Sequence, residues 1–125
     1  MKQIAAYQTK LFKKWNKKSK IPYGKLLVAV KSIDGGSGIV DLGGSLYKVR
    51  ISKDKGKSGG YRTIIMYKKG FRSLFMYGFE KNELDNISDK ELKRAKQYVK
   101  IFLNLSEDRV KNLLDSNSIY PLEEQ

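Results

Sequence analysis

Cationic side chains stand beside aromatic residues in two short tracts of this chain. The tracts are residues 57–63 (KSGGYRT) and 78–83 (GFEKNE), and they contain Arg62 and Lys81. Residues 46–51 (LYKVRI) add Lys48 and Arg50. An arginine clamps a phosphate with two parallel hydrogen bonds, and an aromatic ring stacks on an unpaired base. These tracts therefore predict phosphate chemistry on RNA.

The amino acids that are missing exclude most other reactions. The 125-residue chain has neither histidine nor cysteine. It consequently lacks the usual general base, the usual zinc ligand, disulfides and thiol catalysis. We expect no metal and no cofactor.

A metal-free ribonuclease makes the ribose 2′-OH attack the adjacent phosphate. The reaction needs a base near that oxygen, cations around the pentavalent phosphorane and an acid at the departing 5′-oxygen. Clustered lysines lose a proton more easily because like charge disfavours the ammonium form, whereas arginine stays charged. The chain can provide these groups from four cationic residues: Lys48, Arg50, Arg62 and Lys81. The aromatic residues Tyr61, Tyr77 and Phe79 are nearby in the sequence.

The charge of the chain points to a polyanionic partner. The net charge is +13, and the first 57 residues hold 14 Lys and Arg against three Asp, a net +11. Part of this charge has a simpler interpretation, since Lys13, Lys14, Lys17 and Lys18 also suit a solvated surface. The longest purely apolar run, residues 26–30, is far too short to span a membrane. We see no signal peptide, and a reducing cytoplasmic location is compatible with these features.

The pattern of apolar residues predicts an α+β fold in one domain. It predicts strands at 46–51, 61–67 and 71–79 and a short edge strand at 2–7. It also predicts a helix after Thr9 with Leu11, Phe12 and Trp15 on one face, a helix opened by Pro22, and a turn at 41–44. Capping motifs at Ser88 and Ser106 predict two more helices, to about Leu105 and through Leu114, and Pro121 begins a frayed tail.

The strand pattern also predicts where the cations lie. In residues 46–51 the apolar side chains alternate with Lys48 and Arg50, which places both cations on one face of the sheet. The strands at 61–67 and 71–79 are apolar on both faces, as expected at the centre of a sheet. Between them and the first strand lies a glycine-rich loop that carries Lys53, Lys55 and Lys57 and suits close approach of a phosphate chain.

The same tracts carry a resemblance to a known family. KVRI at 48–51, KGKSGGYRT at 55–63 and YGFEKNE at 77–83, in this order and spacing, resemble toxins of the RelE/HigB type from bacterial type II toxin–antitoxin operons. The resemblance implies two N-terminal helices packed on a twisted antiparallel sheet, followed by C-terminal helices. It spans roughly residues 9–105 by element order, so residues 106–125 form an extra helix and tail.

Activity and partners follow from the resemblance as expectations. It implies cleavage of mRNA, commonly in the ribosomal A site, that leaves a 2′,3′-cyclic phosphate and a 5′-hydroxyl. Arg62 matches the phosphate-binding arginine of the family, Lys48 and Arg50 match strand-borne basic residues, and Lys81 falls in the second basic motif. Asn82 stands where some relatives have arginine, and no counterpart of their C-terminal tyrosine is obvious near Ile87. The implied partner is an antitoxin, of the helix-turn-helix type, in a hetero-oligomer.

Each assignment has a structural alternative. Arg62 could form an ion pair with Glu80 or Glu83, and Lys81 could be a surface lysine. The three aromatic residues Tyr61, Tyr77 and Phe79 fit a core better than base stacking. Glu83 is a weaker candidate base than Lys48. With Arg62, Lys81 and Lys48 as catalytic residues, we expect Arg50, Lys53, Lys55, Lys57, Tyr61 and Asn82 to bind RNA.

Two other functions remain open on the sequence alone. The same fold is used by ParE-like toxins, which bind gyrase and cleave nothing. A non-enzymatic module that binds RNA or DNA through its +13 charge is the other possibility. Loss of toxicity in Arg62→Ala would favour the ribonuclease, and retained toxicity would favour the gyrase-binding toxin. Steeply salt-dependent binding without toxicity would indicate the non-enzymatic module.

Overall fold

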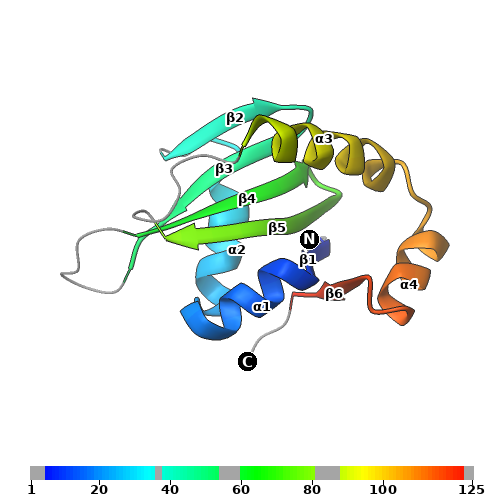
Figure 1. Ribbon diagram of the computed structural model, residues 1–125, viewed down its shortest axis with the longest axis horizontal. Coiled ribbons are helices and arrows are strands. Elements are labelled where there is room, and N and C mark those ends of the chain that lie inside the picture. Colours follow the sequence, from blue (N-terminus) through cyan, green and yellow to red (C-terminus); the bar gives the residue numbers. More distant parts are fainter. Residues whose placement is uncertain (1–4, 36–37, 54–59, 81–87, 123–125) are drawn as a thin grey trace.

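The computed structural model describes residues 5–35, 38–53, 60–80 and 88–122, and it has an α+β fold (Figure 1). In chain order the elements are β1 (Ala5–Thr9), α1 (Lys10–Ser19), α2 (Tyr23–Ser32), β2 (Ile39–Gly43), β3 (Leu46–Ile51), β4 (Tyr61–Lys68), β5 (Arg72–Glu80), α3 (Asp89–Leu103), α4 (Glu107–Asp115) and β6 (Ile119–Pro121). The expected strands at 46–51, 61–67 and 71–79 and all four expected helices are present.

The six strands form one mixed sheet in the order β2-β3-β4-β5-β1-β6. Strands β2, β3, β4 and β5 pair with one another in antiparallel fashion, but β1 runs parallel to β5. The expected wholly antiparallel sheet is therefore a mixed one. The N-terminal strand is also not at an edge, because β6 pairs with its outer side. The partner that covers this side comes from the other end of the chain, which local sequence does not reveal.

Two segments that were predicted to be irregular, a turn and the C-terminal tail, contain strands. Residues 39–43, where a turn was expected from 41, form β2 and pair with β3. The turn lies at Gly43, Gly44 and Ser45, which all have positive φ angles. The chain was expected to fray from Pro121, but residues 119–121 form β6 in the sheet, and the amide of the buried Leu122 donates to the carbonyl of Ala6 at 2.9 Å. Pro121 is tolerated there because β6 is an edge strand.

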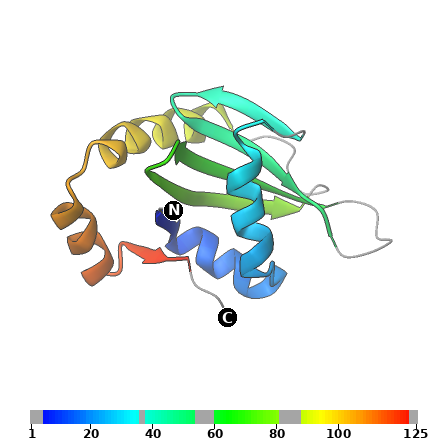
Figure 2. The ribbon, with the colours of Figure 1, turned by 180° about the vertical axis from the view of Figure 1, so that it is seen from behind.

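Strands β4 and β5 form the centre of the sheet because they are apolar on both faces. One face packs against α1 and α2 through a core that includes Phe12, Leu26 and Phe75. The other face packs against α3 and α4 through a core that includes Ile64, Leu74 and Val99. Figure 1 shows α3 on one side of the sheet, and Figure 2 shows α2 crossing the opposite side.

Local capping explains where the helices begin. The hydroxyls of Thr9, Ser88 and Ser106 each accept a hydrogen bond from the backbone three residues later, and Pro22 precedes α2. All four starts agree with the sequence prediction. One predicted core residue is wrong, since Leu11 of α1 is 63% exposed while Phe12 is fully buried.

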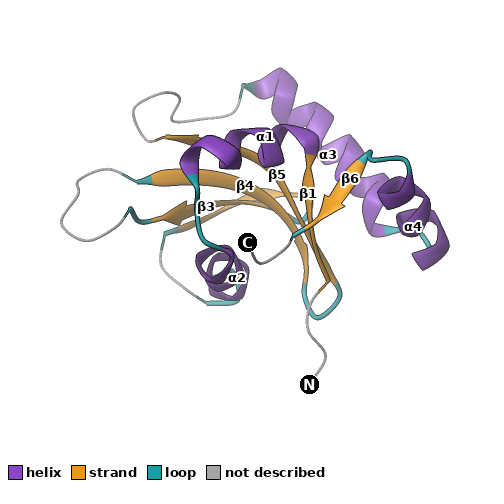
Figure 3. Ribbon diagram, turned by 90° about the horizontal axis from the view of Figure 1, so that it is seen from below, coloured by secondary structure: helices purple, strands orange, loops and turns teal. Residues whose placement is uncertain are grey.

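Helix α1 lies against β5 (Figure 3), and the contact between them includes Gly78 of β5 and Trp15 of α1. A Cβ atom added at Gly78 would overlap the indole ring of Trp15. The ring of Trp15 in turn packs against Phe12 and, edge to face at 5.5 Å, against Tyr61. Gly78 therefore sets how closely α1 approaches the end of β5 that bears Phe79 and Glu80.

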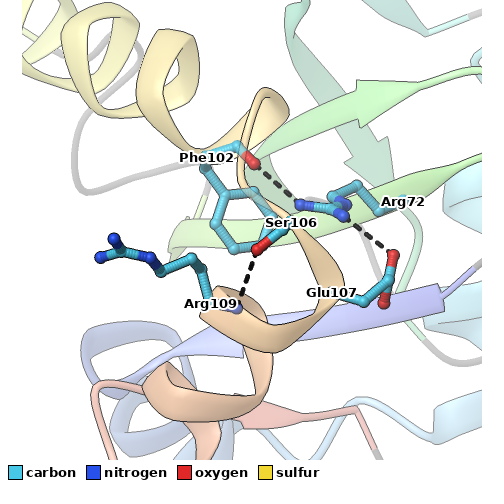
Figure 4. A network of polar contacts seen from close by, with 5 residues as sticks. All are labelled: Arg72, Phe102, Ser106, Glu107 and Arg109. Carbon is cyan, nitrogen blue, oxygen red and sulfur yellow. Dashed lines mark hydrogen bonds and ion pairs between the residues drawn. The ribbon is translucent and has the colours of Figure 1, made fainter.

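A buried arginine joins β5 to the C-terminal helices (Figure 4). Arg72 is 2% exposed, and its guanidinium donates to the carbonyl of Phe102 at 2.9 Å and to the carboxylate of Glu107 at 3.0 Å. It also lies 4.1 Å from the ring centroid of Phe71. Sequence reasoning did not consider Arg72, although a lone arginine at the start of an apolar strand was a usable signal.

Candidate functional site

The sheet register brings two predicted arginines side by side. Arg50 of β3 is directly opposite Arg62 of β4, and Arg62 is in turn opposite Phe79 of β5. Directly opposite residues of antiparallel strands project from the same face, with Cβ atoms roughly 5 Å apart. Within the described part of the chain neither guanidinium forms an ion pair. Two like charges directly opposite each other cost stability, so a bound anion would stabilise this pair.

Lys48 lies on the same face as this arginine pair. It stands two residues before Arg50 on β3 and is opposite Ile64, which is buried. Side chains two residues apart on a strand share a face. The prediction that Lys48 and Arg50 share one face, with Val49 and Ile51 in the core on the other, is confirmed.

Tyr77 also belongs to this face, because it is opposite Ile64 on β5. Burial raises the pKa of Tyr77, the nearby Glu91 raises it further, and Arg94 of α3 opposes this by lowering it. A tyrosine phenol already holds its proton at neutral pH, and a raised pKa keeps the Tyr77 hydroxyl available as a hydrogen-bond donor at higher pH as well. It lines a cavity of about 230 Å³ between α1 and α3, together with Leu11, Arg94 and Tyr98. Arg94 was not among the predicted site residues, since its approach to β5 depends on how α3 packs.

Glu80 and Tyr61 lie on the opposite face from Arg62. They are opposite each other in the β4–β5 register, and Glu80 forms an ion pair with Lys53 at 3.4 Å. The alternative in which Arg62 pairs with Glu80 is thus not what the structure shows. Glu83 lies outside the described residues.

Tyr61 is held on the side of the sheet that packs against α1. Its ring meets Trp15 edge to face, its hydroxyl donates to the carbonyl of Ser19 at 3.4 Å, and Lys53 lies 5.3 Å from its ring centroid. The structure therefore brings together Lys48, Arg50 and Arg62, and it places Tyr61 and Lys53 apart from them. Any RNA contact by Tyr61 or Lys53 would be made on the other face.

The described ends of three strands meet beside the arginine pair. Ile51 at the end of β3 and Glu80 at the end of β5 are both opposite Tyr61 at the start of β4. A Cβ atom at Gly60 would come within 3.1 Å of the carbonyl oxygen of Ile51, so the two chain segments approach closely there. The predicted residues Lys55, Lys57, Lys81 and Asn82 lie outside the described residues.

This arrangement suits the binding of a phosphodiester. Two guanidiniums can clamp non-bridging oxygens, and they stay charged at any physiological pH. Over the described ranges, no group of three or more carboxylates gathers at a place that could hold a metal ion. Among the same residues, no helix is long and apolar enough to cross a membrane.

Comparison with known proteins agrees with the geometry. A search of curated proteins found no match to the chain. The family model described as RelE toxin of RelE / RelB toxin-antitoxin system matches residues 4–122. Members of this family act with a cognate antitoxin and are generally mRNA-cleaving inhibitors of translation. Because the match extends over nearly all of its 125 residues, this chain belongs to the RelE toxin family of toxin–antitoxin systems.

Proposed function

We propose that this chain is a metal-independent endoribonuclease that cleaves mRNA, most often on the ribosome, in the manner of the HigB branch. The observation that carries the proposal is the cross-strand pair of Arg50 and Arg62, with Lys48 on the same face. Membership of the RelE family supports the reaction class. The geometry supports the position of the phosphate clamp.

In the proposed mechanism each proton transfer and each charge is handled by a named side chain. Lys48 takes the proton from the ribose 2′-OH, and the 2′-oxygen attacks the adjacent phosphorus. Arg62, with Arg50, stabilises the charge that develops on the phosphorane oxygens. The bond from phosphorus to the 5′-oxygen then breaks, and Lys81 gives that oxygen a proton. The products are a 2′,3′-cyclic phosphate and a 5′-hydroxyl, with no net consumption of water or metal.

The antitoxin is proposed to be a small helix-turn-helix protein that covers the cationic face. Such a partner would neutralise Arg50 and Arg62 with acidic side chains while the complex is stored. Free toxin would act in the cytoplasm, where mRNA is translated.

The test is cleavage of a defined RNA by the purified chain in excess EDTA. We expect the cleaved ends to carry a 2′,3′-cyclic phosphate and a 5′-hydroxyl, and we expect a substrate with a single 2′-deoxyribose at the cleaved position to stay intact. Ribosomes programmed with an mRNA are the second substrate, because cleavage that needs the A site would be missed with free RNA.

Arg62→Ala and Arg109→Ala form the matched pair for this assay. Both remove one positive charge, but Arg109 is an exposed residue of α4, far along the chain from the sheet face in question. Cleavage and growth arrest should be lost in Arg62→Ala alone. Undiminished toxicity of Arg62→Ala together with DNA damage would contradict the proposal and indicate a gyrase-binding toxin.

A further inference from the structure

Helix α1 carries an uninterrupted stripe of lysines on its outer face. The lysines are Lys10, Lys13, Lys14, Lys17 and Lys18, so their spacing follows i, i+3, i+4, i+7 and i+8. This spacing places all five on one side of the helix, opposite the fully buried Phe12. Every one of the five is exposed. We call these residues the lysine stripe.

The lysine stripe has no counter-charge on its own layer of the fold. No Asp or Glu occurs before Asp34, so every charged side chain of α1 and α2 is a cation. None of the five lysines forms an ion pair within the described residues. Like charges at i, i+4 destabilise a helix, and the stripe holds three such pairs. The stripe is thus a cost to folding.

The helix dipole accounts for only part of the stripe. Lys17 and Lys18 lie in the last turn, where the dipole favours cations. Lys10 lies in the first turn, where the dipole disfavours them, and the first turn contains no acidic residue. Lys13 packs its ammonium 4.0 Å from the ring centroid of Tyr120, which leaves the charge at the surface. Local stability therefore does not explain Lys10 or Lys14.

The residue that follows α1 gives a second, independent indication that positive charge is kept on this surface at the expense of folding stability. Lys20, the residue after the helix, is left-handed with φ 56°. Glycine is the residue that adopts this conformation without strain, and a side chain there costs free energy. Lys20 also lines a groove of about 250 Å³ beside α2, together with Lys13 and Lys17. Three cations from α1 and its cap thus line one groove.

The chemistry of the lysine stripe selects its partner. Membrane insertion would need the apolar side of α1, but that side is buried on the sheet through Phe12. The most exposed large apolar side chains are Val28 of α2, Leu11 of α1 and Ile101 of α3. Of these only Leu11 lies on α1, at the border of the lysine stripe, so a single apolar side chain stands beside the five lysines rather than the apolar patch that a folded protein partner would bury. Lysines act as point charges that track a phosphate chain without reading bases.

We propose that the lysine stripe, with Lys20, binds the phosphate backbone of double-stranded RNA. This surface belongs to the helical layer on one face of the sheet, whereas Arg50 and Arg62 project from the other face. It would hold structured RNA, such as a helix of a large ribonucleoprotein, while the arginine face engages the strand to be cut. The choice of RNA over DNA rests on the proposed function.

The test measures binding of a fluorescent, fully 2′-O-methylated 20-base-pair RNA duplex, which cannot be cleaved, from 50 to 300 mM KCl. In the stripe variant all five lysines are replaced by Gln. The control variant carries Gln at five exposed lysines outside α1, so its net charge is the same: Lys69, Lys90, Lys93, Lys100 and Lys111. Each lost phosphate contact lowers the salt slope by roughly one unit. We expect the stripe variant to lose at least tenfold in affinity near 100 mM salt and three or more units of slope, and the control to change less than threefold.

Lys20→Gly separates the proposal from loss of folding. Because glycine suits the left-handed conformation, this variant should melt at a higher temperature and yet bind the duplex more weakly. Opposite changes in one variant have no explanation through unfolding. Unchanged duplex binding by Lys20→Gly and by the stripe variant would overturn the proposal.

The remaining outcomes are equally decisive. Equal weakening by the stripe and control variants would show that only total charge matters, and would overturn the assignment. Tighter stripe-dependent binding to phosphatidylserine vesicles, or to a DNA duplex of the same sequence, would overturn the choice of RNA. A chain that cuts no RNA but shows the stripe-specific preference for RNA duplex would refute the proposed cleavage while supporting this surface.

Discussion

Arg62 and Arg72 belong to the same hairpin and to the same face of the sheet, but their surroundings differ completely. Arg62 lies near one end of the β4–β5 register, and Arg72, opposite Lys68, lies at the other. Arg72 is buried and its guanidinium is paired with Phe102 and Glu107. Arg62 is only half-buried, and its one hydrogen bond in the described residues goes to the neighbouring carbonyl of Tyr61 at 3.4 Å.

This difference shows how one residue type serves two purposes in one hairpin. The C-terminal part of α3 supplies a carbonyl to Arg72, so the charge is satisfied and acts as a structural link. Arg62 has another arginine, Arg50, as its direct neighbour instead. A cation with donors left over is available to a ligand, whereas a cation whose donors are used is not.

Replacement of Arg62 should have the largest effect, and on activity alone. We expect Arg62→Ala to reduce the rate of RNA cleavage by about 100- to 1,000-fold, because one transition-state donor is worth roughly 3–4 kcal/mol. Removing the repulsion with Arg50 should leave the free energy of unfolding unchanged or slightly higher. Single-turnover cleavage and urea unfolding measure the two quantities. A variant that loses stability in proportion to activity would refute the contrast with Arg72.

Replacement of Arg72 should have the opposite profile. We expect Arg72→Ala to lower the free energy of unfolding by about 3 kcal/mol, since it leaves the carbonyl of Phe102 unpaired and opens a cavity. Arg72→Met fills the space and should recover part of the loss. Glu107 is largely exposed and can be hydrated, so Glu107→Gln is the mild control. Cleavage at temperatures where each variant is folded should stay within about threefold of the unmodified chain.

Substitution of Gly78 tests whether the contact between α1 and β5 stabilises the end of the sheet where Arg62 lies. Gly78→Ala places a methyl group against the ring of Trp15, which should cost about 1–3 kcal/mol of stability. Combining it with Trp15→Leu should restore part of the loss, because the bulk that causes the overlap is removed. Thermal unfolding of the two single variants and the double variant measures this coupling. Strictly additive losses would show that the two residues do not meet as described.

High pH should produce the smallest effect and should leave both arginines charged. Burial raises the pKa of Tyr7 and of Tyr77 above the ordinary value of 10.0. A raised folded pKa means that the folded state holds its proton longer, so stability is constant below pH 10 and falls as the pH rises through the folded pKa values. Unfolding in urea between pH 8 and 11 measures this slope. Tyr77→Phe should make the slope shallower, and an unchanged slope would mean that Tyr77 is already solvated.

Much of the fold was predictable because local signals agreed with tertiary structure. Capping residues at Thr9, Ser88 and Ser106 mark three helix starts correctly, and alternation in residues 46–51 separates the two faces of β3. The errors fall where strand pairing is decided at long range. Residues 39–43 and 119–121 contain turn-forming or proline residues, and only their partners β3 and β1 make them strands.

The candidate site shows the same division. Arg62, Lys48 and Arg50 were selected by residue type and spacing, and the register confirms that they share a face. Tyr61 was grouped with Arg62 because they are adjacent in sequence, but adjacent strand residues point to opposite faces. Arg72 and Arg94 were missed because their surroundings depend on how the C-terminal helices pack on the sheet: Arg72 of β5 contacts Phe102 of α3, and Arg94 of α3 lies beside Tyr77 of β5.

By itself the sequence determined which chemistry is open to this protein: in a cationic chain without histidine or cysteine, arginine and lysine are the side chains that can bind a phosphate. Only the tertiary structure decided which cations are available. The guanidinium of Arg72 donates to a carbonyl and a carboxylate that lie 30 and 35 residues away in the sequence. Arg50 and Arg62 instead lie opposite each other on two adjacent strands. The physical reason is that residue type sets what a side chain can donate, but packing and register set what remains to accept it.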